Sequence, residues 1–166
     1  MAGLSGPLGQ LLATLPQTGR VDWIGLRPAP RAPMQEVDAV LAEAGRGLAG
    51  DRWAGRPDGA RQLTLLQAEH LPVIAGCAGL AAIEPARLRR NLVISGLNLL
   101  ALKGRRFRLG EALCEYSGLC QPCSRMEAAL GPGGWNAMRG HGGITARVLE
   151  SGWVRIGDAL AVEHLP

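Results

Sequence analysis

The stretch ITARVLESGWVRIGDALAVEHL, residues 144–165, decides the fold class of this chain. Apolar and polar residues alternate in it in short runs, and Ser-Gly at 151–152 and Gly-Asp at 157–158 interrupt them. A period of two residues indicates strands, and small-residue pairs of this kind indicate tight turns. The stretch therefore predicts three short strands joined by tight turns.

The rest of the chain repeats this pattern of short elements. Strands are predicted at 20–28, within 36–53, and at 61–66, 91–96, 107–110 and 112–118. Helices are predicted at 4–15, 67–80 and 124–131, with one helical turn at 84–90 and a mixed loop and helical turn at 133–143. Nine or ten strands without regular βαβ alternation favour a β-rich mixed α/β fold, either a β-barrel or a strongly bent mixed sheet with peripheral short helices.

Length and composition agree with this interpretation. The chain has 166 residues, enough for one domain with a small appendage, and 24 glycines and 11 prolines argue against a helical bundle. Hydrophobic residues make up 47% and aromatic residues 4%, so the core is built from aliphatic side chains. We predict an N-terminal helical segment over 1–19 and a single domain over 20–166.

The charge of the chain is carried mainly by arginine. Of 18 basic residues, 17 are Arg and one is Lys103, and the net charge is +4. Arginine grips phosphate or carboxylate with a planar fork, whereas no basic stripe is interleaved with stacking aromatics, so no nucleic-acid partner is expected. No run reaches the roughly 18 apolar residues of a membrane span, and the N-terminus lacks the basic start of a signal sequence. We therefore expect no membrane partner and a cytoplasmic location, where the four cysteines are thiols.

The segment CQPCSR, residues 120–125, allows several interpretations. It could be half a zinc site, a redox pair, or two ordinary cysteines, but no second Cys or His pair follows it, and a thioredoxin-like pair would lie much earlier in the chain. Pro122 can set a helix entry, which places Cys123 where free backbone N–H groups favour a thiolate, with Arg125 as a nearby cation. Such a thiolate suits a soft-metal ligand or a nucleophile.

Several segments combine arginine with glycine or with a strand start. GLAGDRW contains Arg52, RQLTL contains Arg61 and Gln62, and LRRN contains Arg89, Arg90 and Asn91. The segment at 131–148 holds six glycines, among them Gly142 and Gly143. Glycine-rich loops can aim backbone N–H groups at an anion, and arginine supplies charge. A single arginine at a strand end is usually only solvated, so each segment alone is weak evidence for an anion-binding site.

The order of these motifs closely resembles the MOSC family, the molybdenum cofactor sulfurase C-terminal domain. The resemblance runs from about residue 20 to 162 through GLAGDRW, RQLTLLQAEHL, LRRNLVISGLNL, LKGRRFRLGEALCEYSGLCQPCSRME and MRGHGGITARVLESGWVRIGDAL. It implies a β-rich, barrel-like domain with peripheral short helices. Family members related to the mitochondrial amidoxime-reducing component bind a molybdopterin cofactor and reduce N-hydroxylated compounds.

The resemblance also implies roles for individual residues. The thiolate that holds molybdenum corresponds to Cys123, while the role of Cys120 stays open. Arg52 matches a contact to the cofactor phosphate, and Arg90 with Asn91 matches a contact to the pterin. The remaining residues expected to bind the molybdenum cofactor are Arg61, Gln62, Thr64, Arg125, Gly142 and Gly143.

The chain departs from the family pattern at two places. Trp53 stands where many bacterial members have His after GDR, so a role of that His in substrate handling is lost or changed. The amidoxime-reducing branch carries Lys-Ser near the first Pro-rich loop, where this chain has PAPRAP and Arg31 offers a substitute anion contact.

The resemblance predicts a molybdenum-cofactor oxidoreductase acting on a small N-hydroxylated substrate. No flavin or iron–sulfur motif is visible, so electrons are expected from an external electron-donor protein. Two alternatives stay open, a sulfur carrier with a Cys123 persulfide in cofactor or metal–sulfur cluster assembly, and a non-enzymatic cofactor-binding module. A homodimer is also left open.

Overall fold

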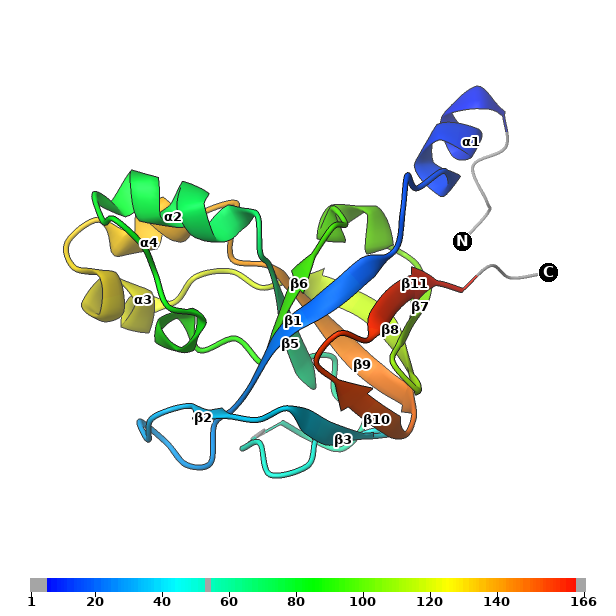
Figure 1. The fold of residues 1–166 in the computed structure, drawn as a ribbon, viewed down its shortest axis with the longest axis horizontal. Coiled ribbons are helices and arrows are strands. Elements are labelled where there is room, and N and C mark those ends of the chain that lie inside the picture. Colours follow the sequence, from blue (N-terminus) through cyan, green and yellow to red (C-terminus); the bar gives the residue numbers. More distant parts are fainter. Residues whose placement is uncertain (1–5, 53–54, 164–166) are drawn as a thin grey trace.

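The computed structural model describes residues 6–52 and 55–163, and in this part a β-barrel carries a helical lobe at one end (Figure 1). The strands are β1 (Gly19–Leu26), β2 (Gln35–Glu36), β3 (Ala39–Glu43), β4 (Gly47–Leu48), β5 (Leu63–Gln67), β6 (Leu92–Ser95), β7 (Arg106–Leu109), β8 (Ala112–Leu119), β9 (Ile144–Glu150), β10 (Gly152–Arg155) and β11 (Ala159–Val162). The helices are α1 (Pro7–Ala13), α2 (His70–Ala78), α3 (Ser124–Leu130) and α4 (Gly134–Met138), with 3₁₀ turns η1 (Pro85–Leu88) and η2 (Leu99–Leu102).

The barrel has seven strands in the order β11-β7-β8-β9-β5-β6-β1, and pairing of β1 with β11 closes it. All of its pairs are antiparallel except β5–β6, which is parallel. A smaller sheet of β10, β3 and β4 lies against one side. The predicted β-rich, barrel-like fold with peripheral short helices is confirmed.

Residues 144–165 form the predicted strands β9, β10 and β11 as far as residue 163, the last one described. The second of these strands leaves the barrel, because Trp153 and Val154 pair with Leu41 and Val40 of β3. The turn at 157–158 then returns the chain to the barrel, where β11 pairs with β7.

Alternation along β5 explains how the barrel and the helical lobe share one strand. Leu63 and Leu65 belong to the barrel core, whereas Leu66 belongs to a second core that lies under the helices. Because successive side chains point to opposite faces, Leu66 and Thr64 lie on the side of the strand away from the barrel interior. A strand that is covered on both faces has a nearly continuous apolar sequence, and this explains why three of the four residues in LTLL are leucine.

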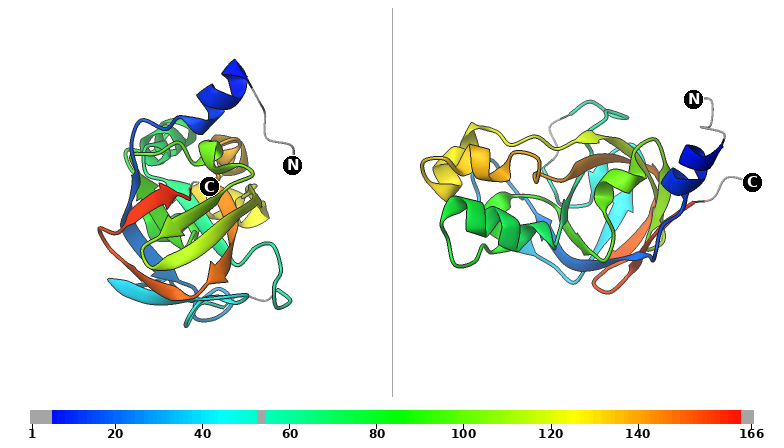
Figure 2. Two further views of the ribbon diagram at one scale, coloured as in Figure 1. Left: turned by 90° about the vertical axis from the view of Figure 1, so that its right-hand side faces the viewer. Right: turned by 90° about the horizontal axis from the view of Figure 1, so that it is seen from above.

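The helical lobe consists of α2, η1, α3 and α4, and the right panel of Figure 2 shows it at one end of the barrel. Its core contains Ile74, Leu88, Met126, Leu130 and Met138, all buried. Glu127 joins its last two helices, since its carboxylate accepts hydrogen bonds from the backbone N–H groups of Gly133 (2.7 Å) and Trp135 (2.8 Å). The lobe is thus a packed unit that fixes the start of α3.

Helix α1 lies away from both cores. None of its residues is buried, and Leu8, Leu11 and Leu12 are exposed. It projects from the barrel beside β11 in Figure 1. The division of the chain into 1–19 and 20–166 stays a prediction. None of the helices in the described ranges has the length and apolar character that crossing a membrane requires.

Candidate functional site

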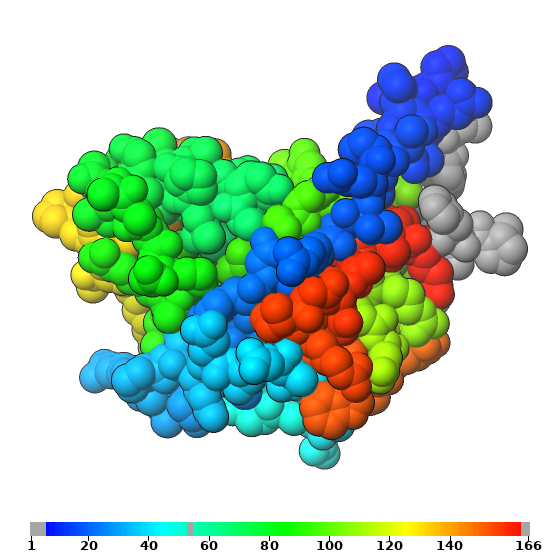
Figure 3. All heavy atoms as spheres, in the orientation of Figure 1, coloured from blue at the N-terminus to red at the C-terminus, as the bar shows by residue number. Residues whose placement is uncertain are grey.

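A cavity of about 650 Å³ lies between the barrel end and the helical lobe. Its walls come from the end of β1 and the loop after it, from residues 52–61, from β5, from the η1–β6 junction, and from the segment 120–126. Figure 3 shows a notch at this edge of the molecule, between the helical lobe and the loop that leads to β2. The volume lies within the range of small-molecule and cofactor sites, roughly 300–1,000 Å³.

Arginine dominates the lining of this cavity. Among the described residues, seven arginines and no acidic residue line it: Arg27, Arg52, Arg56, Arg61, Arg89, Arg90 and Arg125. They come from four separate segments of the chain, so the fold gathers a positive charge that no single sequence segment carries. A cavity of this kind selects an anionic ligand.

One carboxylate lies behind this lining and balances Arg27. The Nε and Nη2 atoms of Arg27 donate to the two carboxylate oxygens of Asp51 at 3.1 and 2.7 Å, and the Asp51 side chain is only 1% exposed. The backbone N–H of Arg52 donates to the carbonyl of Arg27 at 2.7 Å. The ion pair therefore holds the loop that presents Arg52 against the end of β1.

Arg90 is the buried cation of the cavity. It is 6% exposed, and its Nε and Nη1 atoms donate to the carbonyl oxygens of Gly142 (2.9 Å) and Leu88 (3.0 Å). Its Nη2 atom is buried and has no hydrogen-bond partner within the described ranges. A buried charged donor without an acceptor is costly, so an anionic ligand in the cavity would complete this group.

The two cysteines of CQPCSR both line the cavity but differ in exposure. Cys120 is buried and Cys123 is exposed, and both are free thiols. Cys123 is the N-cap residue of α3, where the sequence places it. The Nε1 atom of Trp135 donates to the carbonyl of Pro122 at 3.0 Å, so α4 holds the loop between the cysteines.

Gly142 and Gly143 provide the close approach of two backbone segments. A Cβ atom on Gly142 would lie 2.1 Å from the carbonyl oxygen of Cys120, and one on Gly143 would lie 2.0 Å from that of Leu65. The backbone N–H of Cys120 donates to the carbonyl of Gly143 at 2.8 Å. Both glycines line a smaller cavity of about 40 Å³ rather than the large one, and Cys120 and Gln121 form a wall common to both.

Three polar residues expected at the cofactor lie on or beside β5. Thr64 lines the cavity. Asn91 is fully buried, and its Oδ1 atom accepts from the backbone N–H and the hydroxyl of Thr64, both at 3.1 Å. Gln62 is also buried, and its amide bridges the backbone of Gly59 and Val148 at 3.0 and 2.9 Å. Neither Gln62 nor Asn91 lines the cavity, so the structure shows them supporting its walls, and direct contact with a cofactor stays a prediction.

The structure adds Arg27 and Arg56 to the arginines named from the sequence, and it places Arg89 of LRRN, which was not expected to bind the cofactor, in the same lining. Arg27 directly follows the last residue of β1 and precedes Pro28, and an arginine between a strand and a proline is the sequence signal that could have identified it. Arg89 adopts a left-handed backbone conformation with φ of 55°, which turns it into the cavity side of the LRRN segment. Arg31 is exposed and does not line the cavity, and Trp53 lies outside the described residues.

Arg89 lies in a cavity wall that also contains other arginines. Its Nη1 atom donates to the carbonyl of Ala32 at 2.7 Å, which joins η1 to the loop before β2. Partial burial lowers the pKa of Arg89, and the charges of Arg27 and Arg125 lower it further, against an opposing effect of Asp51. The two charge effects, which are smaller than that of burial, reflect repulsion between Arg89 and these cations.

Comparison with solved structures shows the same fold in bacterial proteins. The YuaD protein of Bacillus subtilis superposes with a TM-score of 0.76 at 22% identity, covering 90% of this chain and 98% of that one. The YiiM protein of Escherichia coli gives 0.70 at 24% identity, with 91% and 72% covered, and YiiM of Geobacillus stearothermophilus gives 0.66 at 19%, with 88% and 75% covered. A comparison with curated proteins gives no match.

The fold and the arginine-lined cavity define a barrel domain whose large cavity has a positively charged lining. The family model of the MOSC domain matches residues 43–161, which is 119 of the 166 residues. The chain therefore belongs to the MOSC domain family, which is named after the C-terminal domain of molybdenum cofactor sulfurase.

Proposed function

We propose that the large cavity binds a molybdopterin-type molybdenum cofactor and that the chain reduces small N-hydroxylated compounds. The observation that carries the proposal is the combination of an exposed thiol, Cys123, with the unpaired, buried Nη2 atom of Arg90 in one cavity. A soft metal favours a thiolate ligand, and a pterin phosphate favours arginine donors. Membership of the MOSC family supports the same cofactor.

The proposal assigns roles to the residues of the cavity. Cys123 would supply the protein's ligand to the metal, and Arg52 and Arg90 would bind the phosphate and the pterin. Thr64 and Arg61 lie on the same walls and would add donors. Arg125, Gln62, Asn91, Gly142 and Gly143 complete the predicted binding set, the last four through the walls that they hold in place.

The reaction consumes two electrons and two protons, breaks the N–O bond, and releases the reduced nitrogen compound and water. When bound, the cofactor supplies the metal centre that exchanges these electrons. The chain's own residues bind the cofactor, orient the substrate beside Cys123 and set the charge of the cavity. We propose a separate electron-donor protein, such as a flavoprotein, as the source of the electrons.

The decisive experiment replaces Cys123 by Ser in protein made in a host that synthesises the cofactor. Cys123→Ser should lose molybdenum and reductase activity while keeping its fold, because this exposed side chain contributes little to the core. Metal analysis by mass spectrometry and circular dichroism measure the two quantities. Cys77→Ser is the matched control, since Cys77 is also exposed but lies on α2 away from the cavity lining. Full molybdenum in Cys123→Ser would refute the ligand assignment.

A sulfur carrier is the second candidate, and the position of Cys120 favours it. Cys120 lines the same cavity as Cys123, so a persulfide on Cys123 would have a second thiol on the same wall. Cyanide-releasable sulfur on Cys123 without bound molybdenum would favour the carrier. Full molybdenum and pterin without turnover, even with a strong reductant, would instead favour a non-enzymatic binding module.

A further inference from the structure

The cavity carries more positive charge than the proposed cofactor would balance, and this inference rests on the proposed function. Asp51 balances one of the seven arginines, which leaves six. A phosphate monoester adds about two negative charges at neutral pH. Several cations would therefore remain without a counter-charge beside the reacting centre, and a second anion would relieve their repulsion.

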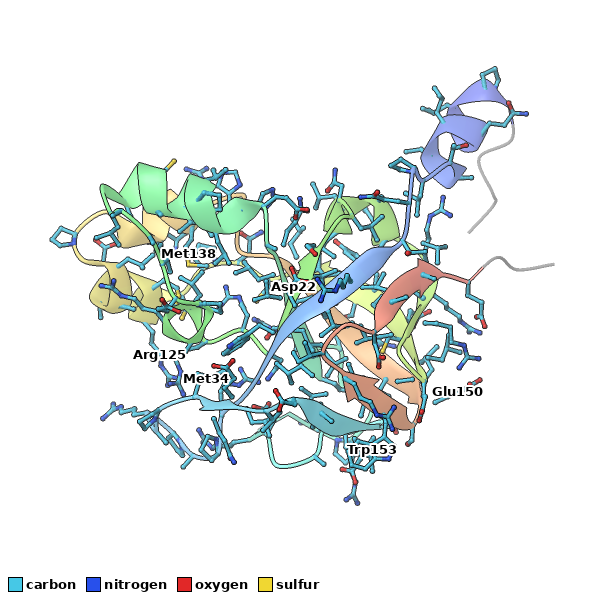
Figure 4. All side chains as sticks on the ribbon, viewed as in Figure 1. Asp22, Met34, Arg125, Met138, Glu150 and Trp153 are labelled. Carbon is cyan, nitrogen blue, oxygen red and sulfur yellow. The ribbon has the colours of Figure 1, made fainter. Side chains whose placement is uncertain are left out.

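Arg125 occupies the right place to bind that second anion. It lies two residues after Cys123 in the first turn of α3, and it lines the cavity with an exposed side chain. Figure 4 shows it on the side of α3 that faces the loop leading to β2. Its guanidinium has neither an ion-pair nor a hydrogen-bond partner in residues 6–52 and 55–163, so its donors are free for a ligand.

Arg89 provides a second cation on a different wall of the cavity. The hydrogen bond from its Nη1 atom to Ala32 fixes its position, and the remaining donors of its guanidinium are unused among the described residues. Arg125 and Arg89 line the same cavity, and α3, which carries Arg125, packs against η1, which ends just before Arg89. Arg89 is the C-cap residue of η1, and its left-handed backbone, with φ of 55°, directs it to the cavity side of this segment.

We infer that Arg125 and Arg89 form a subsite for an acidic group of the substrate, separate from the cofactor contacts of Arg52 and Arg90. The substrate class is then N-hydroxylated small molecules that carry a carboxylate or a phosphate. The acidic group lies between α3 and η1, and the N-hydroxyl group points toward Cys123. This assignment replaces the cofactor contact that the sequence predicts for Arg125.

The test compares matched substrates and a matched non-reacting ligand. Benzamidoxime, 4-carboxybenzamidoxime and 4-phosphonobenzamidoxime are turned over by the molybdenum-loaded protein with reduced viologen, and kcat/KM is divided by molybdenum content. Binding of 4-carboxybenzamide against neutral benzamide is measured by calorimetry in the same preparations. Wild type is compared with Arg125→Gln and with Arg139→Gln, a nearby exposed arginine that stacks on Trp135 and does not line the cavity.

The acidic substrates should be preferred, and their preference over benzamidoxime should fall about ten- to hundredfold in Arg125→Gln, the loss expected for a charge-assisted hydrogen bond. Arg139→Gln should keep the wild-type preference. The relative size of the fall for the carboxy and phosphono substrates identifies which acidic group the subsite prefers.

The binding measurement separates the two proposals. Equal binding of 4-carboxybenzamide to wild type and Arg125→Gln overturns the subsite, whatever the turnover. Binding that depends on Arg125 without turnover of any substrate supports the subsite and refutes the reductase. Equal turnover of acidic and neutral substrates by both proteins refutes the subsite and leaves the reductase standing.

Discussion

Adding one methyl group at Gly142 should displace the cysteine segment. A Cβ atom at this position would lie 2.1 Å from the carbonyl oxygen of Cys120 and 3.4 Å from Nη2 of Arg90. Ordinary contact begins near 3.4 Å, so the segment must move by more than 1 Å. That movement would break the hydrogen bond between the backbone N–H of Cys120 and the carbonyl of Gly143.

The size of the effect follows from these two changes. Overpacking costs about 1–3 kcal/mol, and one lost buried hydrogen bond adds about 1 kcal/mol. For a chain of this length, each kcal/mol shifts Tm by roughly 2–4 °C, so Gly142→Ala should lower Tm by about 4–16 °C. Thermal unfolding followed by circular dichroism measures this shift, and metal analysis of the same preparation measures cofactor retention, which should fall because Cys123 shares the displaced segment.

Gly76→Ala adds the same methyl group where it meets nothing. Gly76 lies in α2, and an added Cβ atom has no neighbour within 4 Å. Alanine is the better helix former, so this variant should match or slightly exceed the wild-type Tm. If Gly142→Ala unfolds within 1 °C (about the error of such a measurement) of wild type and keeps its molybdenum, the close approach of the two segments does not exist.

Three further predictions concern the cavity, the lobe and the electron supply. Arg52→Ala should purify folded, because this exposed side chain has no hydrogen bond in the described part of the chain. Its retention of the pterin should fall about ten- to hundredfold. A full cofactor complement in this variant would contradict the role of Arg52. Burial lowers the pKa of His70 below 6.5, and the charge of His141 lowers it further, against an opposing effect of Glu69. The unfolded state therefore binds more protons than the folded state, and the free energy of unfolding falls as pH drops below 6.5. His70→Gln should therefore show a smaller fall of Tm on acidification than wild type, and an identical pH profile would exclude this contribution. The loaded protein should be inert with NADH or NADPH alone and active with reduced viologen, and turnover with NADH alone would refute the need for a donor.

The strands of the barrel could be predicted where local pattern and turn chemistry agree. Residues 144–163 form three strands with both expected turns, because alternation and small-residue pairs act locally. The departure of β10 to pair with β3 could not be predicted, since that pairing joins residues more than a hundred positions apart. The 3₁₀ turn η2 was also missed, because LLAL resembles the apolar runs on either side.

The candidate site could be predicted only in part. Cys123, Arg52, Arg61, Thr64, Arg90 and Arg125 all line one cavity, as expected of a shared site. Asn91 and Gln62 lie in its walls, because a polar side chain at a strand start can serve the backbone of neighbouring strands equally well. Arg89 was passed over in favour of its neighbour Arg90, and its left-handed backbone leaves no mark in the sequence.

The seam that closes the barrel has a consequence for where the molecule opens first. In the described ranges, the residue pairs Gly19–Leu160 and Arg20–Ala159 join β1 to β11, and three pairs join β11 to β7. Two backbone hydrogen bonds of Val21, with Gly157 and Asp158, extend this short seam. Local opening begins where the fewest hydrogen bonds must break, so amide protons of β11 should exchange with solvent through partial opening. The seam lies at the first residues of β1, whereas the cavity lining begins at Arg27, directly after its last residue, and Figure 1 shows the course of β1 between them. We therefore expect local opening of the barrel to begin at the end away from the arginine cavity and to leave the cavity walls in place.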